Sequence, residues 1–178
     1  VLRADVLHIQ TPPYMEVTDA KVEGFQKFFN HVDMGQVRVA WEVRSSQGKG
    51  FNPRLASLMN DLGIVHCVDI SRQDPAFESD MLYTRLFGAD GGAPHNIYRF
   101  KDAELRKVSE KVDRASKSAS YLTFHSVRMY TDAAKLKAYR QTGEFPKVKE
   151  AAERQKMEGS AKTGLALLGF RPQGCPVS

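Results

Sequence analysis

Apolar residues along the chain recur at two spacings, one typical of strands and one typical of helices. Short strand-like runs fall at residues 6–10, 37–44, 64–69, 81–87 and 121–125. Apolar residues at helical spacing occupy about 18–32, 52–62, 102–117 and 131–139. Strands and helices therefore alternate, except across residues 70–80, which are too short and polar for a packed helix. This order predicts an α/β fold of parallel strands joined by crossover helices.

The strand at residues 37–44 indicates which kind of parallel sheet to expect. Val39, Trp41 and Val43 share one face, whereas the alternate positions, which include Glu42 and Arg44, share the other. A central strand of an open doubly wound sheet is covered on both faces and is nearly all apolar. A barrel strand turns one face to the helices and the other into the barrel, whose end can be polar. We therefore expect part of a (β/α)8 TIM-type barrel.

Several segments resemble one family of barrel proteins. They are Val6-Leu7-His8-Ile9-Gln10-Thr11-Pro12-Pro13, Val39-Ala40-Trp41-Glu42-Val43-Arg44, Leu82-Tyr83-Thr84-Arg85-Leu86-Phe87-Gly88, and Ile97-Tyr98-Arg99-Phe100 leading to Glu104-Leu105. Together their order and spacing over residues 5–125 are similar to the YecE-like domain-of-unknown-function family 72. The resemblance implies that the chain holds the fourth to eighth strands, with the first three βα units absent.

The chain also departs from the family pattern. Phe87 stands where the family has a histidine, and His125 and Ser126 replace an asparagine pair. Five parallel strands cannot close a barrel, and an open strand edge invites pairing with another chain. We therefore expect a preceding segment or a second chain to complete the barrel. The expected domains are a partial barrel at 1–146 and a basic helical segment with a flexible tail at 147–178.

Composition and charge narrow the class of protein. The chain has 178 residues, 42% hydrophobic and 26% charged, as in globular proteins, and no run long enough to cross a membrane. Two cysteines, Cys67 and Cys175, do not form a disulfide framework, so we expect a cytoplasmic protein. Residues 1–98 hold 9 Lys/Arg and 12 Asp/Glu, whereas residues 99–178 hold 17 and 9. This basic second half favours nucleic acid or another phosphate-bearing partner, although solvated helix faces explain it equally well.

Charged residues at the carboxyl ends of the expected strands are candidates for chemistry, because barrel enzymes place their sites there. Glu42 would act as general base or metal ligand, while Arg44 and Arg85 would hold an anion. The alternative is a structural network of ion pairs among these three side chains.

Asp69 and His125 extend the candidate catalytic set. Glu42 and Asp69 could together bind Mg²⁺ or Mn²⁺, although a role for Asp69 in capping the turn after its strand is the simpler explanation. His125 could be an acid or base, or simply a surface histidine. His8 and His66 lie within strands, so we expect them to be packed or hydrogen-bonded.

The loop at 88–94 follows the strand that would be seventh in the barrel, where barrels often bind phosphate. Exposed amides in glycine-rich turns attract anions, but a flexible connection explains the loop as well. Gln10, Gly88 and Tyr98 complete the predicted substrate- and anion-binding set with Arg44 and Arg85.

The predicted function is that of an enzyme, a hydrolase or lyase acting on a phosphorylated or nucleic-acid substrate at the barrel mouth. A non-catalytic module that binds nucleic acid or another anion is the alternative, and a sugar-phosphate isomerase is a weaker one. The family resemblance implies a fold without an activity.

Overall fold

The computed structural model describes residues 4–44, 51–88, 97–146 and 166–170. Their elements run β1 (Val6–Thr11), α1 (Asp19–His31), β2 (Arg38–Val43), α2 (Pro53–Asp61), β3 (Val65–His66), β4 (Met81–Leu86), α3 (Asp102–Ala115), β5 (Ala119–Phe124), α4 (Met129–Thr142) and β6 (Ala166–Phe170). The predicted α/β class and the alternation of strands with helices are confirmed. Two compact units form, residues 1–68 with 75–83 and residues 69–74 with 84–178.

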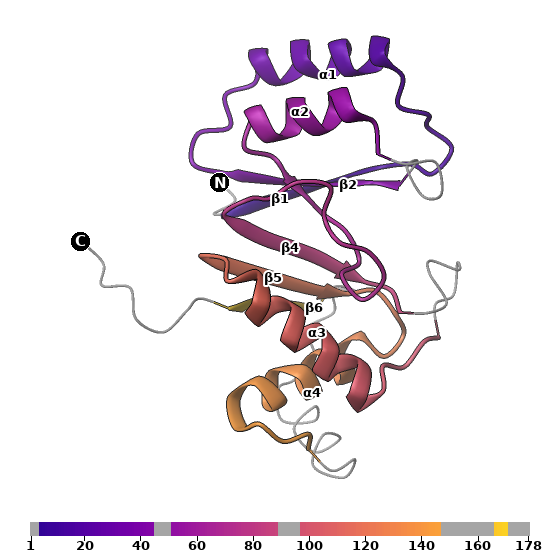
Figure 1. The fold of residues 1–178 in the computed structure, drawn as a ribbon, viewed down its shortest axis with the longest axis vertical. Coiled ribbons are helices and arrows are strands. Elements are labelled where there is room, and N and C mark those ends of the chain that lie inside the picture. The colour runs from indigo at the N-terminus through magenta and orange to yellow at the C-terminus, as the bar shows by residue number, and fades with distance from the viewer. Residues whose placement is uncertain (1–3, 45–50, 89–96, 147–165, 171–178) are drawn as a thin grey trace, which may run out of the picture. The chain divides into compact units, whose positions relative to one another are not determined.

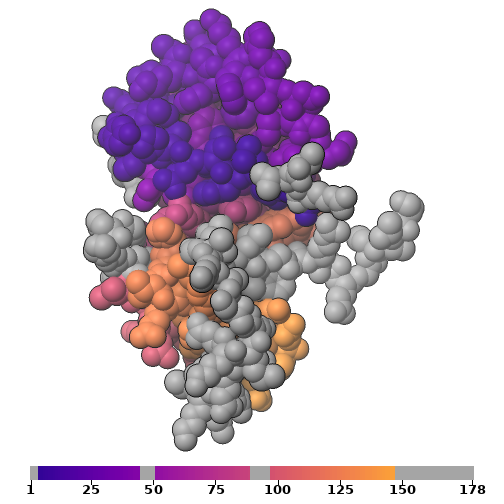
Figure 2. Space-filling view, turned by 180° about the vertical axis from the view of Figure 1, so that it is seen from behind, coloured from indigo at the N-terminus to yellow at the C-terminus, as the bar shows by residue number. Residues whose placement is uncertain are grey.

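The first unit contains a parallel sheet in the order β1-β2-β3. Helices α1 and α2 lie together on one face of this sheet (Figure 1). The atoms of the N-terminal segment and those around α2 form one continuous surface in the space-filling view (Figure 2). The two helices cover the face of the sheet that carries the apolar side chains of β2.

Trp41 is at the centre of the core between this sheet and its helices. It is 2% exposed and packs with Val39 and Val43 of β2 against Leu55 and Met59 of α2. Phe25 of α1 meets the indole edge-on, with the ring centres 4.8 Å apart. Burying an aromatic ring and several aliphatic side chains contributes roughly 2 kcal/mol for each large residue. The prediction that Val39, Trp41 and Val43 share the face of the strand that packs on helices is confirmed.

Helix α2 begins and ends where its sequence predicts. The Asn52 side chain accepts hydrogen bonds from the backbone N–H groups of Arg54 and Leu55, and Pro53 takes the first helical position. Gly63 follows the helix with a φ of +64°, a conformation that glycine adopts without strain. These local signals set where α2 ends and where the chain enters β3.

The second unit contains the remainder of β4 with β5 and β6, and α3 and α4 lie along this sheet (Figure 1). Leu105, Val108 and Val112 of α3 are buried, as their spacing predicts. Phe100 and Phe124 meet edge-to-face in its core, with ring centres 5.6 Å apart. The unit therefore has an apolar core of its own.

The sheets differ from the expectation of five parallel strands in one barrel sheet. The described strands form two three-stranded sheets, and β6 pairs antiparallel to β5. Strand β6 was not predicted: it is a five-residue strand with an internal glycine, and it lies inside the segment expected to be a flexible tail. The predicted third strand, 64–69, is reduced to Val65–His66, because Asp69 already begins a turn. The predicted helix at 147–158 lies outside the described residues.

Candidate functional site

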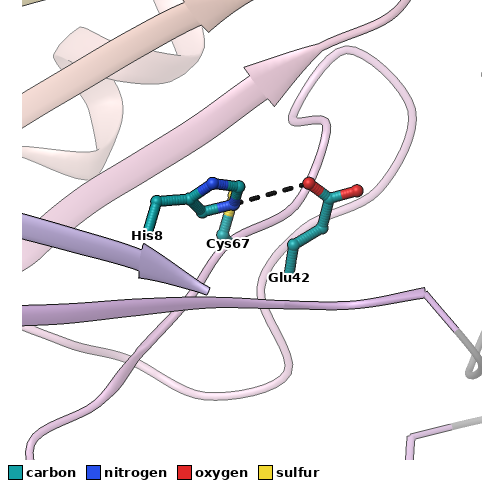
Figure 3. A group of neighbouring side chains, drawn as sticks. All are labelled: His8, Glu42 and Cys67. Atoms are coloured by element: carbon teal, nitrogen blue, oxygen red, sulfur yellow. Dashed lines mark ion pairs between the residues drawn. The ribbon is translucent and has the colours of Figure 1, made fainter. Parts of the chain in front are cut away.

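Three side chains of different chemistry converge on the face of the β1-β2-β3 sheet opposite the helices. His8 of β1 pairs in register with Ala40, and Glu42 lies two residues further along β2. The backbone N–H of Cys67 donates to the carbonyl of Trp41, which continues the pairing of β2 with β3. Since side chains alternate along strands, His8 and Glu42 leave the sheet on the face opposite Trp41. Figure 3 shows His8, Glu42 and Cys67 side by side.

Glu42 lies between a histidine and an arginine. Its Oε2 atom is 3.5 Å from His8 Nε2, and its Oε1 atom is 3.4 Å from Arg44 Nε. Its side chain is only 8% exposed. The ligand atoms of His8, Glu42 and Cys67 all lie within 4.8 Å of one another. A buried carboxylate with a cation beside it and two further metal-ligand groups nearby can bind a cation or act as a base.

The His8 ring stacks on an aromatic side chain and turns one nitrogen toward Glu42. It stacks on Tyr83, with ring centres 5.3 Å apart and planes 12° from parallel. Its Nε2 atom is buried and, among the described residues, has no hydrogen-bond partner. The expectation of a packed histidine is met for the ring. The Nε2 atom faces Glu42.

Gln10 and Arg44 belong to the same end of this sheet. Gln10 pairs in register with Glu42, so both side chains leave the sheet on the same face. Arg44 follows β2 directly, and the expected proximity of Glu42 and Arg44 is present as the ion pair described above. The end of the β1–β2 pair thus places an amide and a guanidinium near the buried carboxylate.

Asp69 holds a turn together. Its Oδ1 atom accepts hydrogen bonds from the backbone N–H and hydroxyl of Ser71, at 2.9 and 2.5 Å. Its Oδ2 atom accepts from the backbone N–H groups of Phe87 and Gly88, at 2.8 and 3.2 Å. These four bonds favour the capping alternative for Asp69. They also occupy the Gly88 amide, which the anion-binding interpretation required to be exposed.

Arg85 and His125 come together in the second unit. An Arg85 Nη2 donates to His125 Nδ1 at 2.8 Å, and both groups contact the Phe87 ring, with 5.0 Å to its centre in each case. Because arginine can only donate, the proton of a neutral His125 lies on Nε2. Of the alternative network of Glu42, Arg44 and Arg85, the ion pair between Glu42 and Arg44 is present. Arg85 pairs with His125.

A cavity of about 330 Å³ lies in the second unit between α3 and the turn that follows Asp69. Its basic lining residues are Arg72, Lys107 and Lys111. Gly88 also lines it, and the Tyr98 hydroxyl donates to Glu104 at its margin. Lys111 is paired with Asp74 at 2.9 Å. Two of the predicted anion contacts, Gly88 and Tyr98, thus lie near a basic cavity, whereas residues 89–94 of the predicted phosphate loop lie outside the described residues.

Two buried titratable groups have shifted pKa values outside these clusters. Burial lowers the pKa of His66 to about 4, and its Nδ1 atom accepts a hydrogen bond from the Ala76 N–H at 3.0 Å. Burial raises the pKa of Asp132 to about 6, against the opposing effects of the Phe100 N–H and of Lys135. The expected packing of His66 is confirmed. No sequence signal distinguished Asp132 from an ordinary residue in the first turn of a helix.

The residues that sequence reasoning missed at the Glu42 cluster are His8 and Cys67. Each lies in an apolar strand-like run, and neither has a histidine or cysteine neighbour at a metal-ligand spacing. The sequence feature that could have identified His8 is its position on the strand face that alternates with the core residues. His8 and Glu42 occupy the strand face that alternates with the core residues, and the pairing of β1, β2 and β3 brings them beside Cys67, which follows β3.

Among the described residues, none of the helices combines the length and apolarity that crossing a bilayer requires.

Searches of curated proteins and of solved structures gave no match to this chain. A family described as "Protein of unknown function DUF72" matches residues 2–157. The match extends beyond residues 5–125, where the resemblance was placed, and the described chain has six strands, so the assignment to the family's fourth to eighth strands does not fit. Because the match covers most of the sequence, the chain belongs to the DUF72 family.

Proposed function

We propose that this protein is an enzyme, a metal-assisted hydrolase or lyase that acts on a phosphorylated or nucleic-acid substrate. The observation that carries the proposal is the buried Glu42 carboxylate, which lies 3.5 Å from His8 Nε2 and 3.4 Å from Arg44 Nε. The reactive face is that of the β1-β2-β3 sheet opposite α1 and α2.

The cost of burying Glu42 supports a working role for it. Moving a carboxylate out of water costs several kcal/mol even after relaxation, and one cation beside it offsets only part of this. An aliphatic residue at position 42 would avoid the cost. A carboxylate that binds a metal ion, or removes a proton from water, gives a reason for keeping the charge there.

Arg44 supports a substrate with a negative charge. A guanidinium binds phosphate with two parallel hydrogen bonds, and Arg44 keeps a side chain that is 23% exposed while its Nε atom faces Glu42. The excess of Lys and Arg in residues 99–178 would attract the same class of substrate over a longer range. Gln10, opposite Glu42 in the register, offers a further polar contact.

We also propose that the fold is part of a (β/α)8 barrel in which further strands, from the same polypeptide or a second one, complete a polar lumen around Glu42. Support comes from β2, whose one face packs on helices while the other carries Glu42, with His8 of β1 beside it. In barrel enzymes the site is at the carboxyl ends of the strands, where Glu42 and Arg44 lie.

A panel of phosphomonoesters, phosphodiesters, DNA and RNA, assayed with Mg²⁺, Mn²⁺ or Zn²⁺, tests the proposal. Turnover by the wild-type protein should fall by at least about 100-fold in Glu42→Gln, since a group that acts in proton transfer or metal binding supplies that much. Glu110→Gln, on the exposed side of α3, is the matched control and should retain full activity. Absence of turnover, or equal turnover in Glu42→Gln, would refute the proposal.

The basic cavity of the second unit supports a second candidate, a module that binds a phosphate-bearing ligand without reaction. This function predicts binding that weakens steeply with salt and that Lys107→Gln weakens, while Glu42→Gln leaves it unchanged. Binding of inorganic phosphate or a short oligonucleotide, measured by calorimetry at two salt concentrations, separates the candidates. Loss of binding in Glu42→Gln with full binding in Lys107→Gln would exclude the module.

A further inference from the structure

The ligand atoms gathered around Glu42 include an imidazole nitrogen, a carboxylate oxygen and a thiol sulfur. They come from β1, from β2 and from the residue directly after β3, and all lie within 4.8 Å of one another (Figure 3). This mixture is uncommon in a core, where a histidine and a glutamate side by side usually share a hydrogen bond. Here His8 Nε2 is buried, points at Glu42 from 3.5 Å, and has no hydrogen-bond partner among the described residues.

The spacing suits a tetrahedral ion. With zinc–nitrogen and zinc–oxygen bonds of about 2.05 Å and a zinc–sulfur bond of about 2.3 Å, tetrahedral angles set ligand atoms about 3.3 to 3.6 Å apart. The His8–Glu42 distance of 3.5 Å is within that range. The 4.8 Å bound for the set leaves Cys67 Sγ no more than about 1.5 Å to move toward the others, which a rotation of side chains accomplishes.

We propose that His8, Glu42 and Cys67 form a binding site for a transition-metal ion of the Zn²⁺ type. The site supplies three protein ligands and leaves the fourth position open for water or substrate, the arrangement of catalytic zinc sites. The inference rests on the proposed function where it gives the ion a catalytic role; the binding itself requires only the three side chains.

The sulfur ligand selects the metal. Mg²⁺ and Mn²⁺ prefer oxygen ligands, so the earlier expectation of those ions with Glu42 and Asp69 requires an all-oxygen site. Asp69 uses both of its oxygens in backbone and Ser71 hydrogen bonds, whereas Cys67 and His8 are the groups that accompany Glu42. Thiolate and imidazole favour Zn²⁺, and Cys67 loses its proton to the solvent when the ion binds.

Arg44 would stand beside such an ion without competing for it. Its Nε atom is next to Glu42 Oε1, while His8 Nε2 is next to Oε2. One carboxylate oxygen is therefore directed to the proposed ion and the other to the guanidinium. A guanidinium beside a metal with an open position suits a substrate that presents an anionic oxygen to both.

Metal binding by the full chain tests the proposal. The reduced, metal-free protein is titrated with Zn²⁺ by calorimetry and, separately, with Co²⁺, whose thiolate charge-transfer absorption reports a cobalt–sulfur bond. We expect one ion per chain and a Co²⁺ spectrum typical of tetrahedral sites. Cys67→Ser and His8→Gln should each weaken Zn²⁺ binding by more than about 100-fold, since loss of groups that merely support ligands costs up to that much.

Matched substitutions give the controls. Cys175→Ser removes the other cysteine, outside the described residues, and His31→Gln removes an exposed histidine at the end of α1. Both should bind Zn²⁺ as the wild type does. Because the His8 side chain is 23% exposed, His8→Gln should remain folded even if Cys67→Ser does not, and circular dichroism checks both. No binding by the reduced wild type, or binding that His8→Gln leaves intact, overturns the proposal.

The two proposals fail in different ways. One bound Zn²⁺ that depends on His8 and Cys67, without turnover of any phosphoester, supports the metal site and refutes the enzyme function. Turnover that depends on Glu42 but is unchanged by chelation and by Cys67→Ser supports an enzyme that works without a metal ion, and it overturns the metal site. A His8–Glu42 ion pair with only a structural role predicts the absence of Zn²⁺ binding.

Discussion

Asp132, in the first turn of α4, should destabilise the folded protein when it is ionised. The residue is fully buried, its Oδ2 atom accepts a hydrogen bond from the Phe100 N–H at 3.3 Å, and its Oδ1 atom has no hydrogen-bond partner in the described part of the chain. Burial raises its pKa from 3.8 to about 6. The Asp132→Asn substitution keeps the shape and the acceptor for Phe100 while it removes the charge.

The size of the effect follows from linkage. One pKa unit corresponds to about 1.4 kcal/mol, so the ionised Asp132 lowers the free energy of unfolding by about 3 kcal/mol at pH 8. Because the folded-state pKa is the higher one, this cost is present above pH 6 and disappears as the pH falls toward 4. Between pH 8 and pH 4 the effect of Asp132→Asn on unfolding should change by about 2 kcal/mol, with the variant gaining at pH 8.

Urea unfolding of both proteins at pH 4, 6 and 8 measures this difference. Comparing two pH values removes any constant cost of burying the new amide group. Asp80→Asn is the control of opposite sign, because its two hydrogen bonds from Arg38 lower the pKa of Asp80, and that variant should lose most stability at high pH. An Asp132→Asn effect that is the same at pH 4 and pH 8 would refute the reasoning.

Two further predictions concern other positions. Burial lowers the pKa of His66 to about 4, so the stability that its neutral form contributes is present at pH 7 and is lost as the pH falls from about 6.5 to 4. His66→Gln should therefore flatten the pH dependence of the free energy of unfolding in urea over that range. An unchanged pH dependence would contradict the assignment. Gly88→Ala should cost about 2–4 kcal/mol in thermal unfolding, because a Cβ there would lie 2.0 Å from the Tyr98 ring at a φ of +76°. Gly143→Ala, with φ +79° and no atom within 4 Å, should cost only about 1 kcal/mol, and equal losses would show that the Tyr98 contact is unimportant.

Local signals in the sequence predicted most of the elements. The helices at α2 and α3 both follow from the helical spacing of their buried apolar residues, and Gly63 marks the end of α2. The alternation around Trp41 correctly divided β2 into a core face and a polar face. Such patterns act within a few residues of the chain, which is why they can be read without a structure.

Pairing between distant segments could not be predicted in the same way. The sequence did not indicate that β6 would lie antiparallel to β5, because a five-residue apolar run with a glycine is a weak signal by itself. Likewise, Asp69 looked like a second metal ligand until its hydrogen bonds to Ser71 and to the Phe87 amide were visible. His8 and Cys67 became candidates only once the register had placed them beside Glu42.

Because His8 lies on β1, Glu42 on β2 and Cys67 directly after β3, occupancy of the cluster is linked to the order of the whole first sheet. A ligand held by all three would tie together chain positions 34 and 25 residues apart, as a staple does. It would favour the folded sheet by its binding free energy, and its removal would make local opening of β1, β2 and β3 easier. Amide hydrogen exchange along these strands would then report directly whether the cluster is filled.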